Sequence, residues 1–208
     1  METALAFFTT ALLLAFVPGP DNVFVMTQAA LRGRKAGLLV VLGLCTGLIV
    51  HTTAVALGIA VIFQKSQLAF SLLKYAGSAY LVYLAWQAFR AKPMTDRDDE
   101  NSKNAIGDGG KLYLRGILMN ITNPKVSIFF LAFLPQFVDR QAGYVSLQLS
   151  ALGGIFILAT LLAFSLMTVF AASVGAKVGQ SPRVQKNMNR LAGAVFLGLA
   201  AKLATTER

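Results

Sequence analysis

The sequence predicts an all-α membrane protein with six transmembrane helices, because three properties of the chain agree. Of its 208 residues, 56% are apolar and 13% are charged, and the mean hydropathy is +0.63. Soluble domains carry about 25% charged residues, so this chain has too few to cover a soluble surface. Six apolar segments, each near the roughly 20 residues that a span needs, follow one another, and basic residues gather in alternate loops. We therefore expect a single transmembrane domain, residues 1–208.

The expected spans differ in how clearly the sequence marks them. They cover residues 4–31, 36–63, 68–90, 112–138, 144–176 and 187–204. The second is the clearest, because no charged residue lies between Ala36 and Phe63. The uncharged part of the third is bounded by Lys74 and Arg90, whose long side chains reach towards the membrane interface. The sixth is the weakest, because only residues 191–201 are free of charge.

The basic residues of the loops predict the orientation. Thirteen Lys and Arg residues lie in the first, third and fifth loops, and five lie on the other side. Basic residues near the ends of spans favour the cytoplasm, so both termini are expected outside it. The net charge of +10 is thereby explained by topology, and a nucleic-acid partner is not expected.

A polar segment, residues 93–110, divides the chain into the halves 1–92 and 111–208. It contains the runs DRDDENS and GDGG and almost no apolar residue, which is typical of a cytoplasmic linker. Three spans on each side of it would insert the two halves in opposite directions. We therefore expect an inverted 3+3 repeat.

The first and fourth spans each carry a helix-breaking cluster. Residues 18–22 read PGPDN, and residues 120–125 read NITNPK. Proline removes a backbone donor and clashes with the preceding turn, so both helices are expected to be broken there. Unwound backbone inside a membrane faces a cavity or packed protein, and matching breaks in two halves indicate a transport site. The alternative is a pair of kinks that only aids packing.

Asp21 and Lys125 are the charged residues of these breaks. A carboxylate at the membrane centre costs roughly 2.5 to 3.5 kcal/mol even on an insertion scale, so it needs a partner, a proton or water. Counted from Arg32 and Arg115, the two residues lie about 16 and 15 Å deep at roughly 1.5 Å per residue. We expect them at one level, paired directly or through bound substrate. The alternative is that Lys125 extends to the cytoplasm and Asp21 caps the resumed helix.

The two breaks together suit a zwitterionic amino acid. An acid and exposed carbonyl groups would bind its ammonium group, and a lysine and exposed helix N-termini would bind its carboxylate. The expected substrate-binding residues are Pro18, Gly19, Pro20, Asp21, Asn22, Asn120, Asn123, Pro124 and Lys125. No cofactor and no metal ion is expected.

His51 is the only histidine. It shares one helical stripe with Gly43, Gly47, Ala54 and Gly58. Small residues mark close helix contacts in membranes, so the imidazole is expected to face the bundle. Two roles stay open: a structural bond to a backbone carbonyl group, or proton transfer, for which its ordinary pKa of about 6.5 is suited. Asp21 and His51 are thus the candidates for proton coupling.

Five motifs, in this order, resemble those of the LysE/RhtB superfamily of amino-acid exporters: VPGPDN, GLCTGLIVH, AGSAYLVYLAW, TNPKVSIFFLAFLPQFVD and AGAVFLGLAAKLA. The resemblance covers nearly the whole chain. It implies a six-span transporter of the bacterial inner membrane that exports amino acids or close derivatives in exchange for protons. It also places functional weight on Pro18, Gly19, Pro20, Asp21, Asn123, Pro124 and Lys125. The similarity to RhtB proteins implies neutral solutes such as homoserine, threonine or leucine.

Other classes of membrane protein fit the sequence less well. An enzyme would need a nucleophile with its base, paired acids or metal ligands, and the chain has no GxSxG, no HExxH and no second acid within a span. A structural subunit would need neither matched breaks nor buried charge. A membrane channel stays an alternative, because the sequence alone does not show alternating access. A homo-oligomer is left open.

Overall fold

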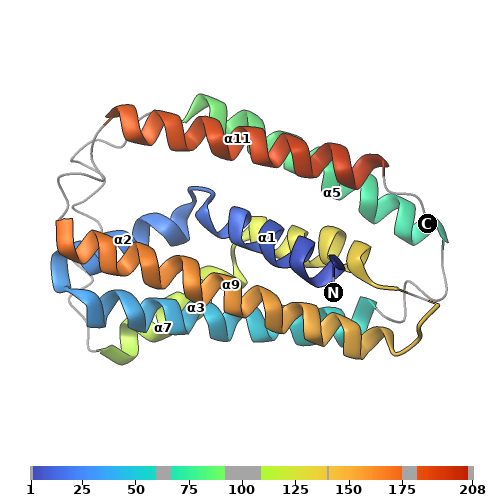
Figure 1. The fold of residues 1–208 in the computed structure, drawn as a ribbon, viewed down its shortest axis with the longest axis horizontal. Helices are drawn as coiled ribbons and strands as arrows, with labels where there is room; N and C mark the ends of the chain where they lie inside the picture. Colours follow the sequence, from blue (N-terminus) through green and yellow to red (C-terminus); the bar gives the residue numbers. More distant parts are fainter. Residues whose placement is uncertain (1, 60–66, 92–108, 140, 175–181, 206–208) are drawn as a thin grey trace.

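The computed structural model describes residues 2–59, 67–91, 109–139, 141–174 and 182–205, and all regular structure in this part of the chain is helical. Most of the helices lie along one long axis, and the first helix begins and the last helix ends in the right half of the view (Figure 1). The first half contains α1 (Glu2–Phe16), α2 (Pro20–Arg32), α3 (Arg34–Ala54), the π-helical η1 (Val55–Ile59) and α5 (Gln67–Arg90). The second half contains α7 (Gly109–Ile121), α8 (Pro124–Ile128), the π-helical η3 (Phe129–Phe133), the 3₁₀-helical η4 (Leu134–Phe137), α9 (Val145–Val174) and α11 (Pro182–Thr205).

Among the described residues, two of the six expected spans, Arg34–Gly58 and Val145–Ser173, have the length and composition of membrane helices. Two bent helix pairs, at the positions of the first and fourth spans, pass the same test only if each pair is counted as one span. α5 and α11 occupy the positions of the third and sixth spans but are less apolar, so their crossing stays a prediction, as does the inverted repeat. The expected linker 93–110 lies outside the described residues except for Gly109 and Gly110, which begin α7.

Both breaks expected in the first and fourth spans are present. α1 and α2 are bent by 65° across residues 17–19, and the helices on either side of residues 122–123 are bent by 49°. In each case the chain resumes its helix at a proline, Pro20 or Pro124, where the missing N–H group leaves no intrahelical bond unmade.

The loop expected after the first span is a single-residue turn. α2 ends at Arg32 and α3 begins at Arg34, so only Gly33 connects them. Its φ angle of +83° lies in the region that favours glycine. α2 and α3 therefore run antiparallel, and their basic ends lie together at the left end of the view (Figure 1).

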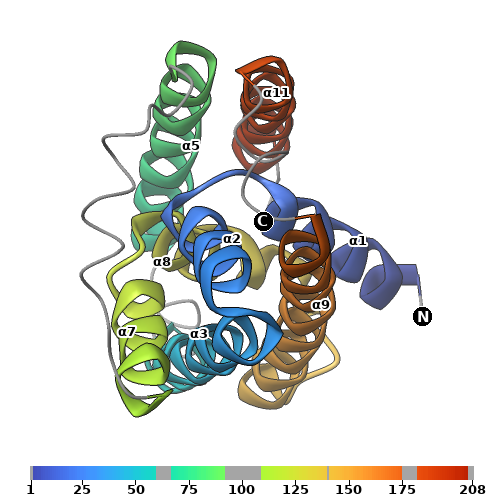
Figure 2. The same cartoon turned by 90° about the vertical axis from the view of Figure 1, so that its left-hand side faces the viewer.

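α3 packs against α2, α7 and α9. Viewed along the bundle, α2, α3, α7 and α9 form one group, and α5 lies beside α11 (Figure 2). α3 approaches α7 through glycines: a Cβ atom on Gly43 would overlap the carbonyl oxygen of Tyr113, and one on Gly116 would lie 2.5 Å from the carbonyl oxygen of Val40. Small residues thus allow close backbone contact, as is common in membranes.

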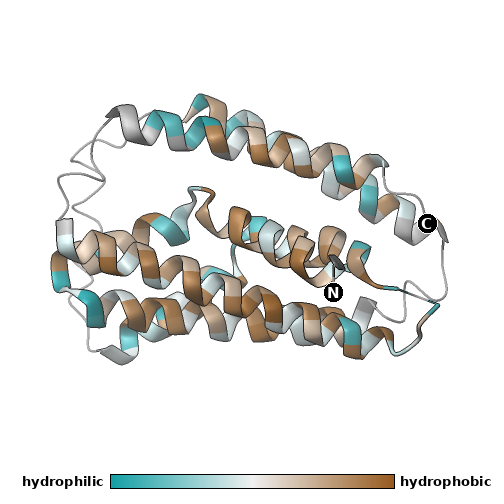
Figure 3. Cartoon of the chain, in the orientation of Figure 1, coloured by the Kyte–Doolittle hydropathy of each residue, from teal (hydrophilic) through white to brown (hydrophobic). Residues whose placement is uncertain are grey.

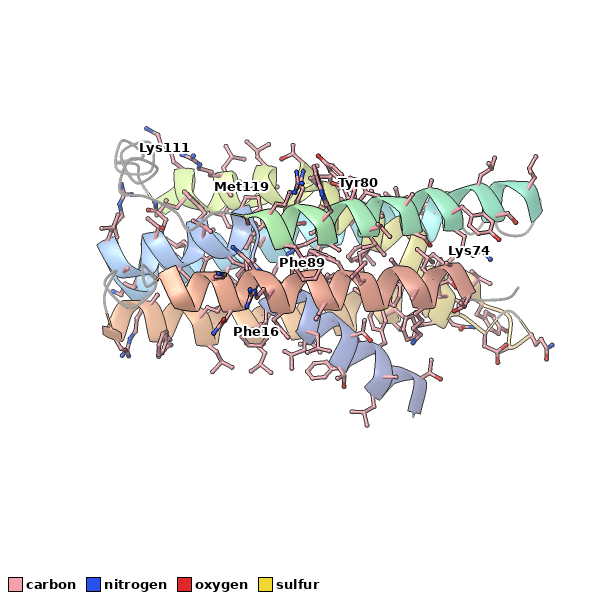
Figure 4. The ribbon with its side chains drawn as sticks, turned by 90° about the horizontal axis from the view of Figure 1, so that it is seen from above. Phe16, Lys74, Tyr80, Phe89, Lys111 and Met119 are labelled. Carbon is pink, nitrogen blue, oxygen red and sulfur yellow. The ribbon has the colours of Figure 1, made fainter. Side chains whose placement is uncertain are left out.

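The pairing of α5 with α11 also depends on a glycine. A Cβ atom on Gly193 would lie 2.6 Å from Cζ of Phe89. Phe89 lies between the two helices in Figure 4, which also shows Lys74 and Lys111 at opposite ends of the molecule. The middle sections of α3 and α9 are apolar, whereas the first turn of α2, at mid-length of the molecule, is hydrophilic (Figure 3).

Candidate functional site

The break between α1 and α2 places a carboxylate at the start of α2. Gly19 is the N-cap in an extended conformation, Pro20 is the first helical residue and Asp21 is the second. The side-chain amide of Asn22 donates to the carbonyl oxygen of Ala15 at 2.8 Å. This bond satisfies a carbonyl group at the end of α1, where four such groups lack intrahelical partners. Asn22 therefore joins the two helix ends.

The break between α7 and α8 places a lysine at the corresponding position. Asn123 is the N-cap, and its Oδ1 atom accepts a bond from the backbone N–H of Lys125 at 3.0 Å. Pro124 is the first helical residue and Lys125 is the second. A cation in the first turn opposes the helix dipole, so Lys125 does not stabilise α8 by its position. The stabilisation of its buried ammonium group must therefore come from groups outside α8.

Each break bonds to the other. The side-chain amide of Asn123 donates to Oδ2 of Asp21 at 2.7 Å, and Nζ of Lys125 donates to the carbonyl oxygen of Val17 at 3.3 Å. A Cβ atom on Gly19 would lie 3.4 Å from the same Nζ. Asp21 and Lys125 are 3% and 8% exposed. Asp21 and Asn123 are 102 residues apart in sequence, and their bond shows that the two breaks meet inside the protein.

A small cavity lies where the breaks meet. Its volume is ≈ 20 Å³, and its polar lining consists of Asp21, Asn120, Lys125 and Thr160. The remaining lining residues are apolar: Leu14, Ala15, Leu44, Leu48, Val126, Phe156 and Phe164. A space of this size holds about one water molecule. An amino acid would therefore fit only after the walls move apart.

Two oxygens at this cavity have hydrogen-bonding capacity left. Oδ1 of Asp21 and Oδ1 of Asn120 are buried and make no hydrogen bond with any residue that the structure describes. Most buried side-chain polar atoms in proteins have a partner. Residues with unused acceptors on a cavity that a lysine also lines suit a ligand that carries both a donor group and an acidic group.

One wall of the cavity is aromatic. Phe156 packs against Phe129 and Phe130, with ring centroids 5.1 and 5.2 Å apart, and Phe7 and Phe133 extend the same cluster. These five side chains are buried, and Phe156 is the member of the cluster that lines the cavity. The other four extend an apolar region behind Phe156.

His51 contacts the site through Asn120. Nε2 of His51 lies 3.2 Å from the backbone carbonyl oxygen of Asn120, and its ring centroid is 5.5 Å from that of Phe130. His51 is half-buried and does not line the cavity. The imidazole faces the bundle as expected.

The stripe expected to contain His51 is only partly correct. Gly43 and Gly47 are buried against α7, but Ala54 and Gly58 are exposed. The regular α-helix ends at Ala54, and the π-helical η1 follows, so the spacing of 3.6 residues per turn does not extend to Gly58.

The remaining residues expected at the site surround the cavity without lining it. Pro18 and Gly19 form the first break, and Pro20 and Pro124 are exposed at the helix starts.

The sequence profile of the LysE type translocator family matches residues 12–207, which include both breaks and the cavity. The chain belongs to the LysE family of translocators.

Several relatives of this LysE-family chain match along nearly its full length. A membrane protein of Bacillus subtilis, YrhP, described as uncharacterized, is 34% identical over 208 residues, covering 97% of this chain and 98% of its own. The homoserine/homoserine lactone efflux protein of Salmonella typhimurium is 32% identical over 202 residues, covering 97% and 96%. An uncharacterized membrane protein of Vibrio cholerae is 31% identical over 204 residues, covering 98% and 97%. No solved structure matches the chain significantly.

Sequence reasoning missed Thr160, which this LysE-family protein places on the cavity from α9. A threonine in an apolar helix gives little signal, because its hydroxyl group often bonds to the carbonyl group four residues before it in the same helix. Thr46 and Thr52 of α3 do so. Only the packing of α9 against the breaks identifies Thr160.

Proposed function

We propose that this LysE-family translocator exports neutral amino acids or close derivatives across the bacterial inner membrane in exchange for protons. The observation that carries the proposal is that Asp21 and Lys125, of opposite charge, line one buried cavity. A zwitterion presents an ammonium group to the carboxylate and a carboxylate to the ammonium group. Such charge-assisted bonds are about twice as strong as neutral ones.

The other lining residues support a small neutral side chain. Asn120 and Thr160 add hydrogen-bonding groups, and the remaining wall is apolar. Among the described residues that line this cavity, Asp21 is the only one with a carboxylate, so a second cationic group on the substrate would have no acidic partner among them. Homoserine, threonine and leucine satisfy these conditions. The name of the Salmonella relative supports the same class, and a lactone would accept from Lys125 through its carbonyl oxygen.

Asp21 also offers a basis for proton exchange. Its carboxylate binds either the ammonium group of the substrate or a proton, because both neutralise the same charge. Carboxylates inside membrane proteins commonly mark proton relays. A proton arriving from the periplasm would displace the substrate, and loss of that proton to the cytoplasm would restore the site.

The proposed orientation places the Gly33 turn in the cytoplasm and both termini in the periplasm. It is supported by the thirteen basic residues of the first, third and fifth loops. The substrate would then approach along α2 and leave past the phenylalanine cluster.

Efflux of preloaded amino acids tests the proposed function directly. Cells or vesicles are loaded separately with homoserine, threonine, leucine and lysine, and efflux is measured with and without a pH gradient. We expect concentrative export of one or more neutral amino acids that a protonophore abolishes. Efflux that only follows the concentration gradient would indicate a channel, and no efflux of any of them would contradict the proposal.

Replacing His51 by Gln should leave the pH dependence of export unchanged. His51 contacts a backbone carbonyl group and does not line the cavity, and a glutamine amide also donates to a carbonyl group. Export rates of wild type and His51→Gln are compared between pH 5.5 and 8 at a fixed gradient. A flattened profile in the variant, with normal insertion, would assign the proton to His51 instead of Asp21.

A further inference from the structure

A second pair of buried polar side chains lies outside the cavity. Gln28 of α2 and Thr168 of α9 are both 0% exposed. Nε2 and Oε1 of Gln28 and Oγ1 of Thr168 make no hydrogen bond with any residue in the described part of the chain. Buried polar side chains without partners are rare, so this pair needs an explanation.

Both residues lie at one level, between the cavity and the Gly33 turn. Gln28 follows Asp21 by seven residues, which is two turns and about 10 Å along the same face of α2. Thr168 follows Thr160 by eight residues, about 12 Å along α9. α2 and α9 pack against each other. Each of the two helices thus carries one polar residue at the cavity and a second polar residue closer to the Gly33 turn.

Gly37 of α3 fixes the position of Thr168. A Cβ atom on Gly37 would lie 3.1 Å from Oγ1 of Thr168 and 2.9 Å from Cβ of Ala29, the residue next to Gln28. The Thr168 hydroxyl therefore lies where α2, α3 and α9 meet. Unlike Thr46 and Thr52, it makes no bond to its own helix.

We propose that Gln28 and Thr168 form a second, uncharged binding subsite for the zwitterionic substrate on its path from the cytoplasm to the cavity. A glutamine amide offers donors for a carboxylate and an oxygen for an ammonium group, and a hydroxyl group does either. Passage requires binding that is strong enough for occupancy and weak enough for release, which suits a site without charge. The proposal rests on the proposed function.

Near-isosteric apolar substitutions, Gln28→Met and Thr168→Val, test this subsite. Replacing unpartnered buried polar groups by apolar ones of similar shape does not destabilise a fold, so both variants should insert normally. Uptake of homoserine, threonine and leucine into inverted membrane vesicles measures KM at the cytoplasmic face. We expect KM to rise about threefold to tenfold for each variant, corresponding to one lost hydrogen bond. KM at the periplasmic face, from exchange in right-side-out vesicles, should not change.

Gln87→Met and Thr9→Val are the matched controls, because both side chains are exposed and lie on α5 and α1. Wild-type KM at the cytoplasmic face in both test variants would overturn the subsite, and so would an equal rise at both faces. These results leave the proposed function intact. If the wild-type protein moves none of the three amino acids, the proposed function fails and the subsite fails with it.

Thiol labelling provides a readout that does not depend on transport rates. Cys45 is the only cysteine, so Cys45→Ala gives a background for single-cysteine variants. We expect a small cationic methanethiosulfonate to modify Thr168→Cys from the cytoplasmic face, and saturating homoserine to slow that modification severalfold. A Thr168→Cys thiol that is unreactive from that face, or a rate that homoserine does not change, would contradict the proposal.

Discussion

Asp21→Asn and Lys125→Met should each abolish concentrative export. Asp21 and Lys125 are buried on one cavity, and each single variant leaves the other charge there without its counterpart. Removing one member of a buried charge pair typically costs about 3–5 kcal/mol, so both single variants should also unfold at lower temperature. Efflux of preloaded amino acids and thermal unfolding in detergent measure the two effects.

The double variant Asp21→Asn/Lys125→Met separates function from stability. It leaves no uncompensated charge, so its unfolding temperature should recover towards that of the wild type. Its export should stay absent, because neither end of the zwitterion has a charged partner. Lys111→Met, at an exposed lysine near the start of α7, is the control and should export normally. Wild-type export in either single variant would remove the basis of the proposed site.

Gly43→Ala should destabilise the packing of α3 against α7. A Cβ atom at this position would overlap the carbonyl oxygen of Tyr113, a backbone atom that moves only if α7 moves. Forcing extra atoms into a packed contact costs typically about 1–3 kcal/mol. α7 carries Asn120 and leads into the second break, so its displacement should lower export as well as the unfolding temperature.

Gly58→Ala is the matched control for this prediction. Nothing lies within 4 Å of a Cβ atom built on Gly58, so the same change should be tolerated there. The yield of monodisperse protein and its unfolding temperature are compared between the two variants. Equal behaviour of Gly43→Ala and Gly58→Ala would contradict the close packing of α3 against α7.

The sequence predicted the breaks and the nearness of Asp21 to Lys125 because both follow from local rules. Proline interrupts a helix wherever it occurs inside one, and depth in a membrane follows from counting residues. The hydrogen bond from Asn123 to Asp21 did not follow, because it depends on how two broken helices are rotated against each other. Asp21 and Lys125 bond to Asn123 and to the carbonyl group of Val17, and their pairing, directly or through bound substrate, stays a prediction.

Other features depended on departures from regular helix geometry or on distant packing. Gly58 is exposed beyond the transition to η1, which spacing alone does not reveal, and Ala54 is exposed at the last residue of α3. The burial of Gln28 and the place of Thr160 on the cavity depend on how helices far apart in sequence pack against one another. The single-residue turn at Gly33 could not be distinguished from a longer basic loop, because Arg32 and Arg34 fit both.

The most direct measurement of the central claim is equilibrium binding of three ligands to the wild type, Asp21→Asn and Lys125→Met. The ligands are a neutral amino acid, its carboxamide, which lacks the carboxylate, and the matching hydroxy acid, which lacks the ammonium group. If the two breaks hold opposite ends of one zwitterion, Lys125→Met should weaken the binding of the amino acid about tenfold to a hundredfold and leave the affinity for the carboxamide unchanged. Asp21→Asn should likewise weaken the binding of the amino acid and leave the affinity for the hydroxy acid unchanged. Equal loss of all three ligands in both variants would contradict the account.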